Sequence, residues 1–127
     1  MAVTRVFWVF AAGGLGSATR YLIGLWAADR FGLSFPYGTL IVNLSGCVLI
    51  GAALQAAAAQ SWDPDVRIAV TAGFLGGFTT YSAFNQETLQ LLQSGATGAA
   101  MFNIAATLIG GLAAGWLGLV VTRQLIG

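Results

Sequence analysis

The chain has 127 residues, of which 57% are hydrophobic and only 7% charged, and its mean hydropathy is +0.82. A soluble domain normally carries charge on about a quarter of its residues, so this composition excludes an ordinary water-soluble protein and indicates that lipid covers most of the surface. The formal net charge of +1 gives no basis for binding nucleic acid.

Charged and turn residues divide the chain into four apolar stretches, each long enough to cross a bilayer, which requires about 20 residues. The predicted helices cover residues 6–28, 37–60, 67–92 and 99–121 of a single transmembrane domain, residues 1–127. The first stretch resembles a signal peptide, but its hydrophobicity continues to Leu25 and further spans follow, so we interpret it as a membrane helix. The clearest turn is SWDPDVR at 61–67, in which Pro64 can begin the next helix. The predicted fold class is an all-α membrane protein.

Four crossings place both termini and the 61–67 loop on the same side of the membrane. That side carries three arginines and two aspartates, whereas the other side has Arg30, with Arg20 within reach. This is a weak positive-inside signal, so the orientation is poorly specified. Two interpretations remain open: both termini lie in the cytoplasm, or the chain inserts both ways and pairs with an inverted copy of itself. Small-residue motifs such as Gly73-xxx-Gly77 favour close helix packing and a homo-oligomer.

The third predicted helix contains GFLGGFTTYSAFNQET at 73–88, in which two adjacent glycines precede a cluster of hydroxyl residues. At 1.5 Å per residue, Gly76 and Thr79 lie roughly 14 to 18 Å from Arg67, near the middle of a hydrocarbon core about 30 Å thick. Such a sequence can interrupt a helix, and carbonyls freed at this depth require protein, water or an ion as partners. The alternative is a continuous helix whose Thr and Ser side chains bond back to their own turn.

Polar residues at similar depth on three helices outline a path walled by aromatic side chains. Asn43 lies roughly 9 Å into its helix from one membrane surface, and Asn103 lies at a similar depth in its own helix. Tyr81 and Phe84 share one helix face at comparable depth, and Thr107 lies one turn beyond Asn103. Buried polar residues are costly in membrane spans and are therefore functional candidates, although each asparagine can also serve only to join two helices.

The stretch GGFTTYSAF at 76–84, followed by Glu87, closely resembles the third-helix signature of the Fluc (CrcB) family of fluoride channels. The resemblance also covers residues 14–20 and the pattern P-Y-G-T-L-x-x-N-x-x-G at 36–46, and it extends over essentially the whole chain. It implies an antiparallel, dual-topology homodimer in the bacterial inner membrane, with two pores through which fluoride leaves the cell passively.

The resemblance also implies roles for individual residues. A structural sodium ion would be held by the backbone carbonyls of Gly76 and Thr79 from both subunits, across an interrupted third helix. The residues expected along the fluoride path are Asn43, Tyr81, Ser82, Phe84, Asn103, Thr107, Arg20 and Glu87. Asn43 would act as an amide donor, and Tyr81 and Phe84 would present ring edges, which carry partial positive charge. An ion pair between Arg20 and Glu87 is the alternative explanation of those two charges.

The sequence departs from the family pattern at three positions. Tyr81 stands where phenylalanine is usual, and Gly111 and Gly115 stand where Ser or Thr would be expected. These departures leave open a non-conducting subunit of a heterodimer. A small dual-topology multidrug-type antiporter is a rival, but it requires an acidic residue in the first helix, where this chain has Arg20. A membrane enzyme would require histidine, paired carboxylates or an activated nucleophile, and the chain has no histidine.

Overall fold

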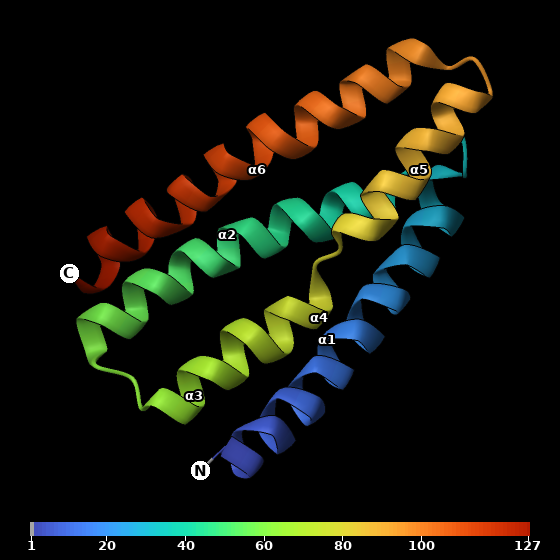
Figure 1. The fold of residues 1–127 in the computed structure, drawn as a ribbon. Coiled ribbons are helices and arrows are strands. Elements are labelled where there is room, and N and C mark those ends of the chain that lie inside the picture. The colour runs from blue at the N-terminus through green and yellow to red at the C-terminus, as the bar shows by residue number, and fades with distance from the viewer. Residues whose placement is uncertain (1) are drawn as a thin grey trace.

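The computed structural model describes residues 2–127, and all the secondary structure in that range is helical (Figure 1). Three helices are apolar and long enough to cross a membrane, by length and composition: α1 (Ala2–Phe31), α2 (Tyr37–Gln60) and α6 (Thr97–Ile126). The remaining traverse, third in chain order, is divided into α3 (Pro64–Ile68), the π-helix η1 (Ala69–Leu75), α4 (Gly76–Phe78) and α5 (Tyr81–Gln93). Helices α1 and α6 extend beyond the predicted 6–28 and 99–121, since no proline or turn motif stops them earlier.

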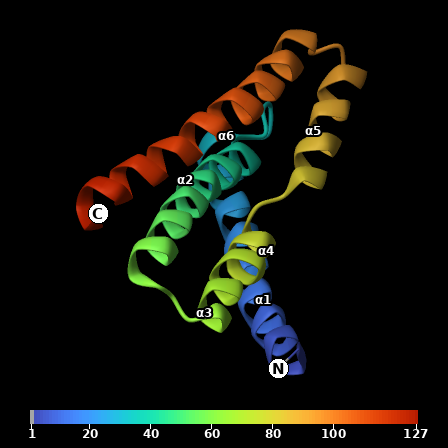
Figure 2. The same ribbon diagram turned by 60° about the vertical axis from the view of Figure 1, so that its left-hand side comes forward.

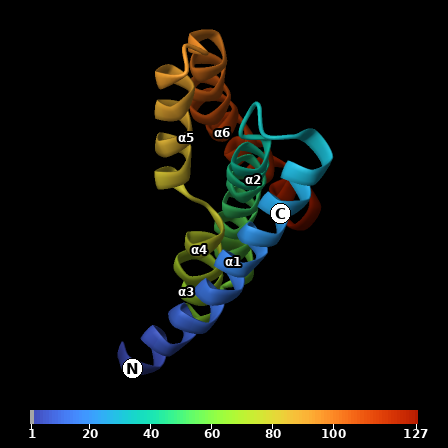
Figure 3. The same cartoon turned by 90° about the vertical axis from the view of Figure 1, so that its right-hand side faces the viewer.

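The four traverses run between two ends of an elongated bundle. Both termini and the 61–63 turn lie at one end, which we call the terminal end, and the 32–36 and 94–96 turns lie at the other, the hairpin end (Figure 1). Helix α2 packs along α6, while α1 packs against η1 and α4 (Figure 2). The α5 segment leaves the axis of α4 and lies beside α6 (Figure 3).

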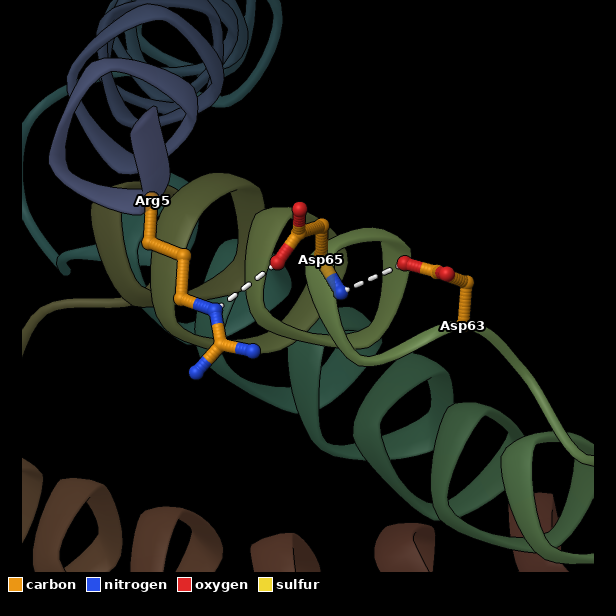
Figure 4. A network of polar contacts seen from close by, with 3 residues as sticks. All are labelled: Arg5, Asp63 and Asp65. Carbon is orange, nitrogen blue, oxygen red and sulfur yellow. Dashed lines mark hydrogen bonds and ion pairs between the residues drawn. The ribbon is translucent and has the colours of Figure 1, made fainter. Parts of the chain in front are cut away.

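Local sequence explains where the helices end. Helix α1 stops at Gly32, whose φ of +81° is readily adopted only by glycine. The side chain of Asp63 accepts a 2.9 Å hydrogen bond from the backbone N–H of Asp65 and caps a helix that begins at Pro64, three residues before its predicted start. Arg5 Nε lies 2.8 Å from Asp65 Oδ1 and joins the first turns of α1 and α3 (Figure 4).

Glycines allow the traverses to approach closely. A Cβ atom added at Gly77 would collide with the carbonyl of Gly13 in α1, and one added at Gly51 would collide with the carbonyl of Gly115 in α6. Gly77 of the third-helix signature therefore lies at a backbone contact with α1. Gly115, one of the departures from the family pattern, lies at a backbone contact with α2. These contacts hold the bundle together by packing, as expected between helices in lipid.

The buried core is small for a chain of this size. Its main cluster consists of Val42, Ala53, Leu75 and Phe78. Large apolar side chains such as Phe10 in α1 and Leu112 in α6 are exposed on the single chain. A surface of this kind is stable only against lipid or a second protein surface.

The third traverse is interrupted at Thr79 and Thr80, so the alternative of a continuous third helix is wrong. Thr79 has φ −85° and ψ 156°, and Thr80 has φ −150° and ψ 116°, both extended conformations. Gly76, by contrast, is helical, with φ −63° and ψ −37°. The chain therefore leaves the helix at the hydroxyl residues rather than at the paired glycines, of which Gly77 is required for contact with α1.

Candidate functional site

The interruption frees backbone groups, and Asn43 in α2 binds two of them. Its Nδ2 donates to the carbonyl oxygen of Thr80 at 3.0 Å, and the N–H of Thr80 donates to Asn43 Oδ1 at 2.8 Å. This two-way bond replaces helix hydrogen bonds that Thr80 cannot make in an extended conformation. Because an amide nitrogen has two hydrogens, one N–H of Asn43 remains after the bond to Thr80.

Helix α1 supplies donors to a second freed carbonyl, that of Gly77. Arg20 Nε donates to this oxygen at 3.2 Å, and Ser17 Oγ lies 3.4 Å from it. Arg20 is thus anchored against the end of α4 by part of its guanidinium group. A charged donor at this carbonyl stabilises a helix end that has lost its own hydrogen-bond partners.

Glu87 is not paired with Arg20, because the one ion pair found among the described residues is the Arg5–Asp65 pair at the terminal end. The Oε1 atom of Glu87 instead accepts a 2.7 Å hydrogen bond from Thr39 in α2, and its Oε2 atom is buried without a partner. Glu87, Arg20, Thr39 and Thr80 line one cavity of about 220 Å³. The cavity therefore contains both charges without a direct contact between them.

Two further carbonyls at the interruption, those of Gly76 and Thr79, accept no hydrogen bond within residues 2–127. The hydroxyl of Thr79 bonds back to the carbonyl of Leu75 at 3.0 Å, so this side chain is already used. The same part of the chain holds no cluster of three or more His, Cys, Asp or Glu residues. A cation at this place would therefore use carbonyl oxygens, which hard cations accept as ligands.

A cavity of about 330 Å³ brings most of the predicted site residues together from α2, α4, the interruption, α5 and α6. The predicted residues that line it are Asn43, Gly76, Thr79, Tyr81, Phe84 and Thr107. The rings of Tyr81 and Phe84 meet edge to face, with centroids 5.5 Å apart and planes at 67°. Phe84 is 6% exposed, whereas Tyr81 is 74% exposed and leaves the cavity open on its side.

Ser82 and Asn103 do not line this cavity. Ser82 is exposed on α5, where its Oγ lies 3.2 Å from the hydroxyl of Thr80. Asn103 is 2% exposed, and its Nδ2 donates to the hydroxyl of Thr88 at 3.0 Å. The structure thus separates these two residues from the other predicted ones.

Sequence reasoning missed three hydroxyl residues that hold the site. Thr39 binds Glu87, Ser17 contacts the Gly77 carbonyl, and Thr80 caps α5 by accepting the N–H of Ala83 at 3.1 Å. Helical spacing was the available signal, since Thr39 lies four residues before Asn43 and Ser17 three residues before Arg20.

Comparison with known proteins relates these features to one family. The family model described as CrcB-like protein, Camphor Resistance (CrcB), matches residues 7–119. A fluoride-specific ion channel FluC from Sorangium cellulosum is 46% identical over 123 residues, covering 96% of this chain and 97% of the relative. Proteins of the same name from Acidobacterium capsulatum and Anaeromyxobacter dehalogenans are 41% and 43% identical, covering 96% and 98% of this chain and 98% and 100% of the relatives.

Proposed function

Because the chain belongs to the CrcB family, we propose that it is a fluoride-specific ion channel in a membrane, and not an enzyme. The observation that carries this proposal is identity above 40% over nearly the full length to relatives named as such channels. Passive conduction would let fluoride leave the cell and so limit fluoride toxicity. This role would require a location in the bacterial inner membrane, which we propose for this chain.

The fluoride path that we propose runs through the cavity of about 330 Å³. The free N–H of Asn43, the ring edges of Tyr81 and Phe84, and the hydroxyl of Thr107 are weak, neutral donors there. Fluoride must exchange a tightly held water shell for such donors, and several weak partners let the ion leave again. A cationic side chain in direct contact with the anion would hold it too firmly for rapid passage.

The charged residues stand beside this path rather than in it. Thr80 lines both the larger cavity and the neighbouring one that contains Arg20 and Glu87, so the two cavities share a wall. Arg20 raises the local concentration of anions electrostatically. Glu87, with one oxygen unpartnered, limits how long an anion stays near the hairpin end. Ser82, exposed at the first turn of α5, adds a hydroxyl at the approach to the cavity.

We propose that a second copy in the inverted orientation covers the exposed ring of Tyr81. The charge distribution supports this arrangement: the terminal end has three arginines against two aspartates, and the hairpin half has two arginines against one aspartate and one glutamate. Neither end is strongly favoured for the cytoplasm. A two-fold axis in the membrane plane, passing near the interruption, would give two pores per dimer.

We propose that a structural sodium ion binds at this axis. The carbonyls of Gly76 and Thr79 fit the ion because they lack hydrogen-bond donors and both residues line the open cavity. Two subunits would supply four such oxygens, and the ion would neutralise dipoles that are costly in a bilayer. Replacing sodium with a large organic cation on both sides should lower dimer stability, and an unchanged dimer would contradict the site.

Fluoride efflux from liposomes that contain the purified protein tests the function directly. We expect rapid release of fluoride and no measurable release of chloride. Equal release of both ions, or none of either, would overturn the proposal. Proton-driven export of a cationic drug would favour the antiporter, and fluoride flux seen only after adding a second, related subunit would identify a non-conducting partner.

A further inference from the structure

We propose that Thr88 and Asn103 are positioning residues that set the rotation of α5 and hence the place of the Phe84 ring. The proposal rests on the fluoride path described above. Phe84 and Thr88 are the two buried residues of α5, each 6% exposed, and they lie one helical turn apart. The rest of α5 is partly or fully exposed on the single chain.

A directed chain of hydrogen bonds links α6 to the backbone of Phe84. The hydroxyl of Thr88 donates to the Phe84 carbonyl at 2.7 Å, so its proton is already used. Thr88 Oγ1 can therefore only accept from Asn103, whose Nδ2 lies 3.0 Å away. This requirement fixes which end of the Asn103 amide faces α5.

The α5 segment needs such a bond because it is not held by a continuous helix. Two extended residues separate it from α4, and its packing is mainly against α6 (Figure 3). A hydrogen bond between two buried side chains restrains rotation, because it forms only over a narrow range of distance and angle. If α5 turned about its axis, Phe84 would move out of the cavity that it lines together with Tyr81 and Thr107.

Asn103 is thereby assigned to positioning rather than to contact with fluoride. Its donor is bound to Thr88, and neither residue lines the cavity that contains Tyr81 and Phe84. A residue that acts through Phe84 must lose its effect on flux when the Phe84 ring is absent, and this consequence separates positioning from general stabilisation.

The experiment measures fluoride efflux per folded dimer for Thr88→Val, which keeps the branched shape and removes the hydroxyl. The variant loses two hydrogen bonds, of which the one to the Phe84 carbonyl lies within α5 and only the one from Asn103 joins α5 to α6. We expect flux to fall about fivefold, the change in population caused by losing that single bond between the helices. Thr88→Ser keeps the hydroxyl and should retain wild-type flux. Thr19→Val is the matched control, because the exposed Thr19 hydroxyl bonds only to Leu15 within its own helix.

A second route removes the donor through Asn103→Leu. Each variant should lower flux equally, and the double variant should lower it no further. If one of the two variants does not assemble, the flux of the other one tests the proposal. Wild-type flux in either assembled variant overturns the proposal.

Combination with Phe84→Leu separates the possible failures. Thr88→Val should cause no further loss in the Phe84→Leu background, whereas a merely structural role would multiply the two losses. Unchanged flux in Phe84→Leu alone would refute the proposed path itself. Reduced flux in Phe84→Leu together with wild-type flux in Thr88→Val would refute only the positioning role.

Discussion

Removal of the Asn43 side chain by substitution with alanine would leave both backbone groups of Thr80 without their partners. Asn43 donates to the Thr80 carbonyl at 3.0 Å and accepts from its N–H at 2.8 Å, and Asn43 itself is only 9% exposed. A buried polar group left unpaired costs about 1 to 3 kcal/mol. Asn43→Ala should therefore lower the free energy of unfolding by about 2 kcal/mol or more, the sum of two such groups at the low end.

The aspartate variant separates the donor from the acceptor. Asn43→Asp keeps an oxygen for the N–H of Thr80 but places a carboxylate against the Thr80 carbonyl and beside the proposed path of the anion. We expect it to destabilise the protein at least as much as Asn43→Ala and to abolish fluoride efflux.

Denaturant unfolding of the purified protein in detergent micelles, with liposome efflux measured in parallel, provides the assay. Asn85→Ala is the control, since Asn85 is exposed on α5 and its side chain forms no hydrogen bond within the described range. This control should change stability by no more than about 0.5 kcal/mol. If Asn43→Ala proved no more destabilising than Asn85→Ala, the two-way bond between Asn43 and Thr80 would not be what holds the interruption.

Other substitutions test the packing, the aromatic pair and the surface charge. Gly77→Ala should prevent folding because its Cβ would collide with the backbone of α1, whereas Gly76→Ala has room within one chain and should fold, as circular dichroism in detergent would reveal. Phe84→Leu should lower fluoride efflux at least about fivefold by removing the positive ring edge, while the proposed dimer remains assembled on size exclusion. Tyr81→Phe, which retains the edge, should leave efflux nearly unchanged, and a large loss would assign the function to the hydroxyl. Arg5→Ala removes a partly exposed ion pair and should cost no more than about 1 kcal/mol in thermal or denaturant unfolding, and less at high salt.

Composition and motif spacing determined the class of the protein and its family. A charge content of 7% requires lipid as the main solvent, and the turn residues divide the chain into four traverses. The predicted 37–60 helix coincides with α2. These features are predictable because hydrophobic length and turn chemistry are local properties of the chain. The same holds for the identification of Asn43, Tyr81 and Phe84 as candidates, since their depth follows from helical rise alone.

The partner of each polar group depends on how the helices pack in three dimensions. The interruption lies at Thr79 and Thr80 rather than at the paired glycines, because contact with α1 keeps Gly77 in the helix while Asn43 binds the extended backbone. Asn103 binds Thr88 rather than lining the cavity that contains the aromatic pair. Helical periodicity predicts which face of its helix a residue occupies. It does not predict which neighbouring helix packs against that face, or which residue of that helix lies opposite. The hydrogen-bond partners depend on close packing between residues far apart in the chain. Glycine contacts such as that of Gly77 with Gly13 determine how closely two helices approach, and hence which backbone groups a side chain can reach.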